Sequence, residues 1–258
     1  MKSNMRLYLL VLLLIPHLFS CNDSGKKTPM VVATNSWTAA FARCAGATEV
    51  ITLAPMEMAH PSEYELRATD IPVVVHAKII VYAGYETMVQ RLKTGMELNS
   101  EVLLKIETDY NMPTIEASVM KIARLLGTEK IAIQNLETIR HLLIEGRARC
   151  DKNGSNARPI LVNFFQQSIV KEMGFQIAGV FGPAALEAGD IDKMMKLESS
   201  VIIDNAHNPV GLPLQQTNPD AKYRQLLNFP GLHQTTTLLE VIQYNILQLS
   251  SLTNKNNQ

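Results

Sequence analysis

The sequence predicts an α/β protein of two lobes, each a mainly parallel sheet flanked by helices, joined by one long helix. Three observations predict this fold. Short apolar segments of the strand type alternate with amphipathic helical segments, this alternation occurs twice along the chain, and a long helical interval separates the two sets. Alternating strands and helices place helices on both faces of a parallel sheet. Because the long helical interval divides the chain into two such sets, we expect two lobes with a cleft between them.

The first 21 residues have the pattern of a lipoprotein signal peptide. Lys2 and Arg6 precede an apolar run, Leu7 to Ile15, that is shorter than the about 20 residues needed to span a bilayer. The run leads to Leu18-Phe19-Ser20-Cys21, which resembles a bacterial lipoprotein cleavage box, so we expect lipidation of Cys21. The alternative is an ordinary signal peptide that is cut elsewhere. Residues 22–29 then predict a flexible tether, and the mature protein is expected outside the cytoplasm, anchored to a membrane in the periplasm or at the cell surface.

The first lobe is predicted over residues 30–127. Ser36 is the expected cap of its first helix, and Asp70 followed by Pro72 indicates the start of the second. The expected elements are strands at 30–34, 50–53, 79–83 and 102–106, and helices at 36–45, after 70, at 85–94 and from about 113.

A linking helix is predicted over residues 128–152, followed by the second lobe over 153–254. Ala132, Leu136, Ile139 and Leu143 form one apolar stripe on the linking helix. The expected elements of the second lobe are strands at 160–162, 175–180, 201–203 and 223–227, and helices ending near 173, after 190, near 212 and from 237.

The charge balance argues against nucleic-acid binding. Lys+Arg and Asp+Glu both number 24, whereas a nucleic-acid-binding domain needs a basic face. The sequence contains no nucleophile elbow, no zinc-protease motif and no phosphate-binding glycine loop, so we expect no enzyme activity. We expect a monomer in which Cys44 and Cys150 are unpaired; a disulfide between them is the alternative.

Polar residues follow a predicted strand in each lobe. His60, Glu63 and Glu65 come after the second strand, and Asp204 and His207 come directly after the strand at 201–203. Because ligands bind beyond the carboxyl ends of parallel strands, one cleft can receive both groups. Imidazole and carboxylate donors together suit Zn²⁺ or Mn²⁺. Taken singly, His207 is better explained as a hydrogen-bonded loop histidine than as a ligand, whereas His60 is explained equally well as an exposed loop residue and Asp204 as a helix cap.

The chain resembles the solute-binding lipoproteins of bacterial ABC importers for zinc and manganese over roughly residues 30–250. The resemblance rests on Val32-Ala33-Thr34, Glu63-Tyr64-Glu65, Thr69-Asp70-Ile71, Ala83-Gly84-Tyr85-Glu86 and Val201-Ile202-Ile203-Asp204. It implies two α/β lobes bridged by a helix, a divalent metal held between them, and delivery of that metal to an ABC permease in the membrane.

The chain departs from that family at several ligand positions. Three positions where the family usually has a histidine ligand carry other residues here: Ser62 at the first, Thr108-Asp109-Tyr110 in the segment of the second, and Asn163 at the third. Asp204 falls at the position of the family's carboxylate ligand. We therefore expect a rearranged metal site made by His60, Asp204 and His207, with zinc as the first candidate metal and manganese as the second.

Glu63 and Glu65 are further candidate ligands of this site. Because imidazole must be neutral to bind a metal, the affinity is expected to fall as the pH drops through about 6–7. The alternatives are a receptor for another solute such as a metal chelate, a surface adhesin on the same fold, and a metal-dependent hydrolase.

Overall fold

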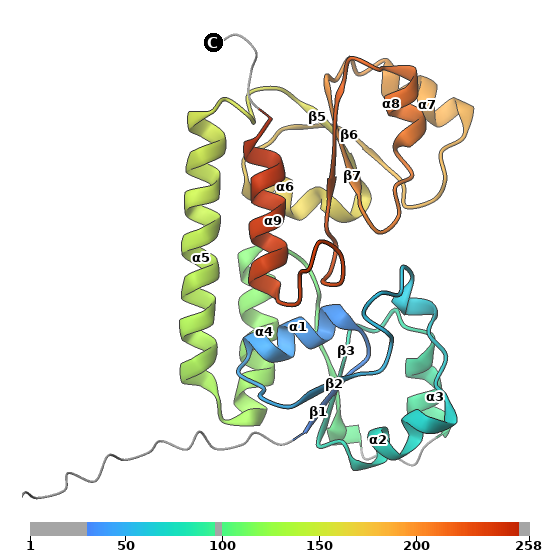
Figure 1. Ribbon diagram of the computed structural model, residues 1–258, viewed down its shortest axis with the longest axis vertical. Coiled ribbons are helices and arrows are strands. Elements are labelled where there is room, and N and C mark those ends of the chain that lie inside the picture. The colour runs from blue at the N-terminus through green and yellow to red at the C-terminus, as the bar shows by residue number, and fades with distance from the viewer. Residues whose placement is uncertain (1–29, 96–99, 253–258) are drawn as a thin grey trace, which may run out of the picture.

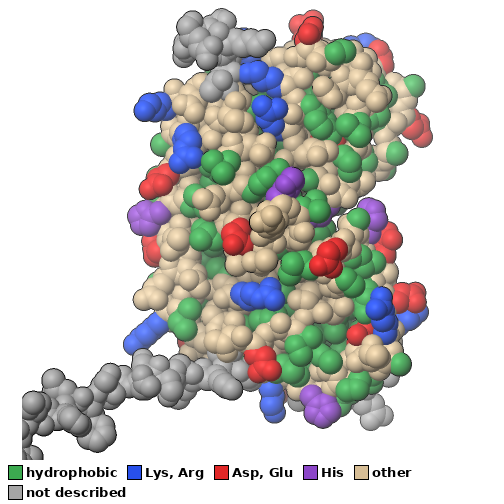
Figure 2. All heavy atoms as spheres, in the orientation of Figure 1, with side chains coloured by type: hydrophobic (Ala, Val, Ile, Leu, Met, Phe, Trp, Pro, Cys, Tyr) green, Lys and Arg blue, Asp and Glu red, His purple; other side chains and the backbone are tan. Residues whose placement is uncertain are grey.

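The computed structural model describes residues 30–95 and 100–252, which form two α/β lobes (Figure 1). The predicted signal peptide, Cys21 and the tether lie outside the described residues. Within the described ranges, no helix combines the length and the apolar character that crossing a membrane requires. Lys, Arg, Asp and Glu side chains are interspersed over the face seen in Figure 2.

The N-terminal lobe contains a parallel sheet in the order β2-β1-β3-β4. Its strands are β1 (Val31–Ala33), β2 (Val50–Thr52), β3 (Ile79–Tyr82) and β4 (Leu103–Lys105). Val31 pairs with Val50 on one side and with Ile79 on the other, which makes β1 a central strand. All residues of β1 and β3 are buried, because helices cover both faces of the sheet.

Alternate residues of these strands pack on opposite faces. Val31 packs with Phe41 of α1 and Ile115 of α4, whereas its neighbour Val32 packs with Val74 of α2 and Leu92 of α3. The helices of this lobe are α1 (Ser36–Cys44), α2 (Ile71–His76), α3 (Met88–Gly95) and α4 (Met112–Leu126), with 3₁₀ turns at Pro61–Glu63, Ala68–Asp70 and Ser100–Val102.

The C-terminal lobe repeats this plan with a parallel sheet in the order β6-β5-β7-β8. Its strands are β5 (Ile160–Asn163), β6 (Ile177–Phe181), β7 (Val201–Asn205) and β8 (Lys222–Leu226). Its helices are α6 (Gln167–Glu172), α7 (Ala188–Met195), α8 (Leu212–Thr217) and α9 (Leu238–Ser250), with a 3₁₀ turn at Phe164–Gln166. Ile169 of α6 and Ile242 of α9 share one core with Ile203, whereas Leu214 of α8 packs with Ile202 on the other face.

One long helix, α5 (Glu129–Lys152), runs beside both lobes (Figure 1). It packs against α4 and α9, and its predicted apolar stripe is buried. A single hydrophobic core extends from Val31 of the first lobe to Ile160 of the second. The predicted fold class, two α/β lobes joined by one long helix, is thereby confirmed.

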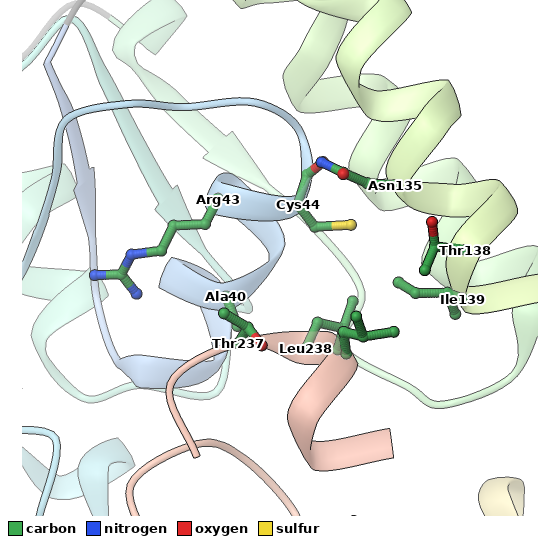
Figure 3. A pocket seen from close by; sticks show the side chains of 9 residues that line it. Ala40, Arg43, Cys44, Asn135, Thr138, Ile139, Thr237 and Leu238 are labelled. Carbon is green, nitrogen blue, oxygen red and sulfur yellow. The ribbon is translucent and has the colours of Figure 1, made fainter. Parts of the chain in front are cut away.

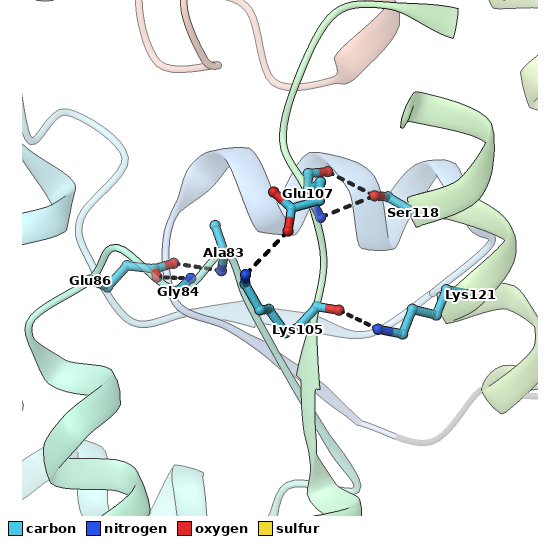
Figure 4. Close-up of polar contacts among 7 residues, drawn as sticks. All are labelled: Ala83, Gly84, Glu86, Lys105, Glu107, Ser118 and Lys121. Carbon is cyan, nitrogen blue, oxygen red and sulfur yellow. Dashed lines mark hydrogen bonds and ion pairs between the residues drawn. The ribbon is translucent and has the colours of Figure 1, made fainter. Parts of the chain in front are cut away.

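Two expected helix starts are wrong in detail. Asn35, not Ser36, caps α1: its side chain accepts a hydrogen bond from Thr38 N at 2.9 Å, and Ser36 Oγ instead donates to Pro230 O at 2.9 Å. Likewise, α3 begins at Met88 and not at residue 85. Glu86 accepts the backbone N–H groups of Ala83 and Gly84, which holds this segment in a turn before the helix (Figure 4).

The contact between α5 and α9 predicts an unusual response to a glycine substitution. A Cβ added at Gly146 of α5 would lie 2.7–3.0 Å from three atoms of Ile246. Alanine normally favours a helix over glycine by about 0.5–1 kcal/mol, but overpacking costs about 1–3 kcal/mol. We expect Gly146→Ala to lower the free energy of unfolding by about 1 kcal/mol, measured by urea denaturation.

Gly189 of α7 is the matched control, because nothing lies within 4 Å of its added Cβ. Gly189→Ala is expected to leave the free energy of unfolding unchanged or to raise it by up to about 1 kcal/mol. If Gly146→Ala is as stable as Gly189→Ala, then α5 and α9 do not pack as closely as described.

Candidate functional site

A cleft of about 330 Å³ lies where the carboxyl ends of strands from the two lobes face each other. It is bordered by Trp37, Ala59, His60, Pro61, Ser62 and Tyr85 of the N-terminal lobe, and by Phe165, Asn205, His207, Asn208, Asn228 and Phe229 of the C-terminal lobe. Each of these residues lies at the carboxyl end of a strand or on the segment that follows it, which is why segments distant in sequence meet here. Aromatic rings and amides predominate among them.

His60 reaches this cleft from the N-terminal lobe. It is exposed and lies just before the 3₁₀ turn, where its carbonyl accepts a hydrogen bond from Glu63 N at 3.0 Å. The side chains of Glu63 and Glu65 are exposed and do not border the cleft. The carboxylate of Glu65 pairs instead with Arg91 at 3.4 Å.

His207 reaches the same cleft from the C-terminal lobe, after β7. Its ring centroid lies 3.7 Å from that of Phe229, and its Nδ1 accepts a long hydrogen bond, 3.4 Å, from Asn228 N. Burial, with a smaller contribution from the charge of His233, lowers the pKa of His207 to about 4. His207 therefore stays neutral through pH 6–7, so it does not titrate in the range that the sequence predicted.

Asp204 is fully buried at the end of β7 and does not border the cleft. Its Oδ1 accepts from Asn163 Nδ2 at 3.1 Å and from Asn205 N at 2.8 Å. Its Oδ2 accepts from Gly211 N at 2.7 Å and from the Tyr223 hydroxyl at 2.6 Å. Burial, together with this hydrogen bond to Asp204, raises the pKa of Tyr223. Both carboxylate oxygens are thus already engaged within the C-terminal lobe.

The structure brings His60 and His207 to one cleft and leaves Asp204, Glu63 and Glu65 outside its lining. Among the described residues, no group of three or more His, Cys, Asp or Glu side chains is arranged to hold a metal ion. Whether the five predicted residues are metal ligands stays a prediction. Asp204 is adjacent in sequence to Asn205, which does border the cleft. The Oδ1 of Asn205 accepts a hydrogen bond from the backbone N–H of His207 at 3.0 Å.

Glu86 has the corresponding place in the N-terminal lobe. It is 3% exposed, and its Oε1 accepts from the Thr34 hydroxyl at 2.6 Å and from Asn35 Nδ2 at 3.1 Å. Its two bonds to the backbone N–H groups of Ala83 and Gly84 complete the set (Figure 4). This carboxylate therefore holds the ends of β1 and β3 together beside the cleft.

Several residues of the cleft were not predicted from the sequence. Trp37 stacks on Tyr110, with ring centroids 5.5 Å apart, and the Tyr110 hydroxyl donates to Asn228 O at 2.9 Å. Of the buried side-chain atoms without a hydrogen-bond partner in the described part of the chain, three belong to residues of this cleft: Trp37 Nε1, His207 Nε2 and Asn228 Oδ1. No motif in the sequence pointed to Trp37 or Asn228.

A second cavity, of about 200 Å³, lies between α1, α5 and α9 (Figure 3). Cys44 borders it, and burial raises the pKa of this thiol to about 12. Cys44 and Cys150 are both free, which confirms the prediction that they are unpaired. A thiol that stays protonated is a poor nucleophile and a poor metal ligand.

The hydrogen bonds of Asp204 predict a role in stability. Asp204→Asn replaces an acceptor oxygen by an amide that meets buried donors, and an unsatisfied buried donor costs about 1–3 kcal/mol. We expect this variant to lose about 2 kcal/mol or more of the free energy of unfolding, measured by urea denaturation of protein free of metal. The control Asp192→Asn, at an exposed ion pair with Lys196, is expected to change it by at most about 0.5 kcal/mol. Unchanged stability of the Asp204 variant together with lost metal affinity would identify Asp204 as a ligand instead.

No protein-family model matches the sequence, and no curated protein matches it. Solved structures match the fold. The SBP FpvC of Pseudomonas aeruginosa, in complex with Ni²⁺, has a TM-score of 0.70 at 18% identity, covering 90% of this chain and 99% of its own. The Mn-bound periplasmic metal binding protein of Candidatus Liberibacter asiaticus has a TM-score of 0.64 at 14% identity, covering 86% and 98%. The laminin-binding protein Lbp of Streptococcus pyogenes has a TM-score of 0.67 at 13% identity, covering 88% and 100%. The chain therefore shares the two-lobe α/β fold of these structures.

Proposed function

We propose that the protein is a solute-binding protein that captures a divalent transition metal between its lobes and passes it to an ABC permease. Zinc is the first candidate for this metal and manganese the second. The observation that carries this proposal is that His60 and His207 border one cleft from opposite lobes. Imidazole nitrogen is a preferred ligand of such ions. Support also comes from matched structures that hold Ni²⁺ or Mn²⁺.

In this proposal the protein acts outside the cytoplasm as a monomer, held at a membrane by lipid on Cys21 and by the tether of residues 22–29. The proposed lobes span residues 30–127 and 153–254, with 128–152 as the linking helix. Nitrogen ligands come from His60 and His207. Glu63 and Glu65, exposed beside His60, are candidate oxygen ligands, whereas Asp204 acts through Asn205, which orients the backbone of His207.

The proposal predicts that both histidines contribute to metal affinity. We expect His60→Ala and His207→Ala each to weaken zinc binding at least about tenfold, equivalent to about 1.4 kcal/mol, because each removes one nitrogen donor. The measurement is a competitive titration of zinc and manganese against a chromophoric chelator. His141→Ala is the matched control, since His141 is exposed on α5 outside the cleft lining. Zinc affinity unchanged in both cleft variants would remove this site.

A specific observation favours a second candidate, a receptor for an organic solute that carries no metal. Nδ1 of His207 accepts the Asn228 N–H, so the neutral ring holds its proton on Nε2. In that tautomer Nε2 donates a hydrogen bond to an oxygen of a solute and offers no lone pair to a metal. Coordination by Nε2 would require the ring proton to move to Nδ1, which would break the hydrogen bond from the Asn228 N–H.

Thermal unfolding separates the two candidates. A ligand that binds only the folded protein raises its Tm, by an amount that grows with concentration over Kd. For metal capture we expect protein stripped by a chelator to gain Tm on addition of Zn²⁺ or Mn²⁺. No gain with either ion, combined with a gain from a metal-free organic solute, would establish the second candidate.

A further inference from the structure

The lining of the cleft, as the described residues form it, contains hydrogen-bonding side chains but no carboxylate, ammonium or guanidinium group. None of the described residues that border it is Asp, Glu, Lys or Arg. The buried carboxylates of Glu86 and Asp204 do not border the cleft, and each accepts hydrogen bonds from donors of its own lobe. A divalent ion without chelators would therefore give up its bound water and find no carboxylate in the lining. Removing a charge from water without pairing it costs free energy. A solute without net charge avoids that cost.

Besides His207 Nε2, two buried polar atoms of described residues that border the cleft lack a hydrogen-bond partner, one in each lobe. Trp37 Nε1 is a hydrogen-bond donor of a residue that is 7% exposed, and Asn228 Oδ1 is an acceptor of a residue that is 6% exposed; neither has a partner among the described residues. Buried polar groups are normally hydrogen-bonded, so each such exception needs an explanation. A solute that offers one acceptor and one donor would satisfy both.

The Trp37 ring and the backbone of Asn228 are held in place before any ligand arrives. The Trp37 ring stacks on Tyr110 and lies 6.3 Å from Phe229. The backbone of Asn228 is fixed on both sides, because its carbonyl accepts the Tyr110 hydroxyl at 2.9 Å and its N–H donates to His207 Nδ1 at 3.4 Å. A preorganised donor and acceptor favour one ligand geometry over others, since little ordering remains to be done on binding.

The size of the cleft agrees with an occupant larger than an ion. Its volume of about 330 Å³ falls at the lower end of the range of small-molecule sites, about 300–1,000 Å³. Tyr85 and Phe165, respectively 51% and 40% exposed, add apolar surface at its border.

We infer that the cleft takes its metal as a neutral complex with small chelators of the α-amino-acid type, recognised by Trp37 Nε1 and Asn228 Oδ1. This inference rests on the proposed function and names the form of its solute. Two amino-acid anions neutralise one divalent ion. The carboxylate oxygen that does not face the metal accepts the Trp37 N–H, and the metal-bound amine donates to Asn228 Oδ1.

The test compares free and chelated zinc by isothermal titration calorimetry. The probes are ZnCl₂, the amino acid alone, and the 1:2 complexes of zinc with glycine and with L-histidine. We expect at least one complex to bind about tenfold or more tighter than free Zn²⁺. Trp37→Phe, which keeps the stacked ring but removes the N–H, and Asn228→Ala are each expected to weaken the complex about tenfold while leaving free Zn²⁺ affinity unchanged.

Asn208→Ala is the matched control, because Asn208 also borders the cleft but its side chain already donates to Pro183 O at 3.0 Å. It is expected to leave the affinity for the complex within about twofold, and thermal melting checks that every variant is folded. If free Zn²⁺ binds at least as tightly as each complex, or if the Trp37 and Asn228 variants weaken free and chelated zinc alike, the inference is wrong and the proposed function stands. If no form of zinc or manganese binds, the proposed function itself fails.

Discussion

The cleft depends on two buried carboxylates, one at the strand ends of each lobe. Glu86 accepts two backbone N–H groups, a hydroxyl and an amide, and so does Asp204. Where parallel strands end, backbone donors lose their ladder partners and must find others, since burying them unpaired is costly. Each carboxylate satisfies several such donors at once. The loops that border the cleft are thereby held in one conformation, which is the condition for a preformed binding site.

The position of one lobe relative to the other rests on packing and on a few polar contacts. The shared core along α4, α5 and α9 joins the lobes on one side. On the cleft side, the segment before α9 reaches the N-terminal lobe (Figure 1), where Ser36 donates to Pro230 O and Tyr110 to Asn228 O. Gly231 in this segment has a φ of 132°, and a Cβ there would collide with Met56 O. The close approach of the two lobes therefore requires glycine at this position.

The chemical character of the cleft follows from which side chains remain free after these structural requirements are met. Glu86 and Asp204 are engaged within their lobes, so imidazoles, amides and aromatic rings predominate in the surface offered to a solute. Such a lining combines few hydrogen-bonding groups with apolar area, as small-molecule sites do. The same fold can thus present very different ligand chemistry without any change in its core.

Local patterns in the sequence are sufficient to predict the two lobes, the long helix and the order of strands and helices. These depend on apolar periodicity within single segments, such as the stripe from Ala132 to Leu143, and periodicity is a local property of the chain. The sequence also places His60 and His207 beyond the carboxyl ends of strands, one in each lobe, and the structure shows that both border one cleft.

The role of each polar residue, in contrast, depends on contacts between distant parts of the chain. Asp204 had the position of a ligand, yet Asn163, Gly211 and Tyr223, all distant in sequence, engage its carboxylate. Trp37 and Asn228 had no motif, yet packing against Tyr110 and Phe229 leaves their polar atoms without partners at the cleft. The physical reason is that a hydrogen-bonding group acquires its role from the donors and acceptors around it, and the fold assembles those from separate parts of the chain.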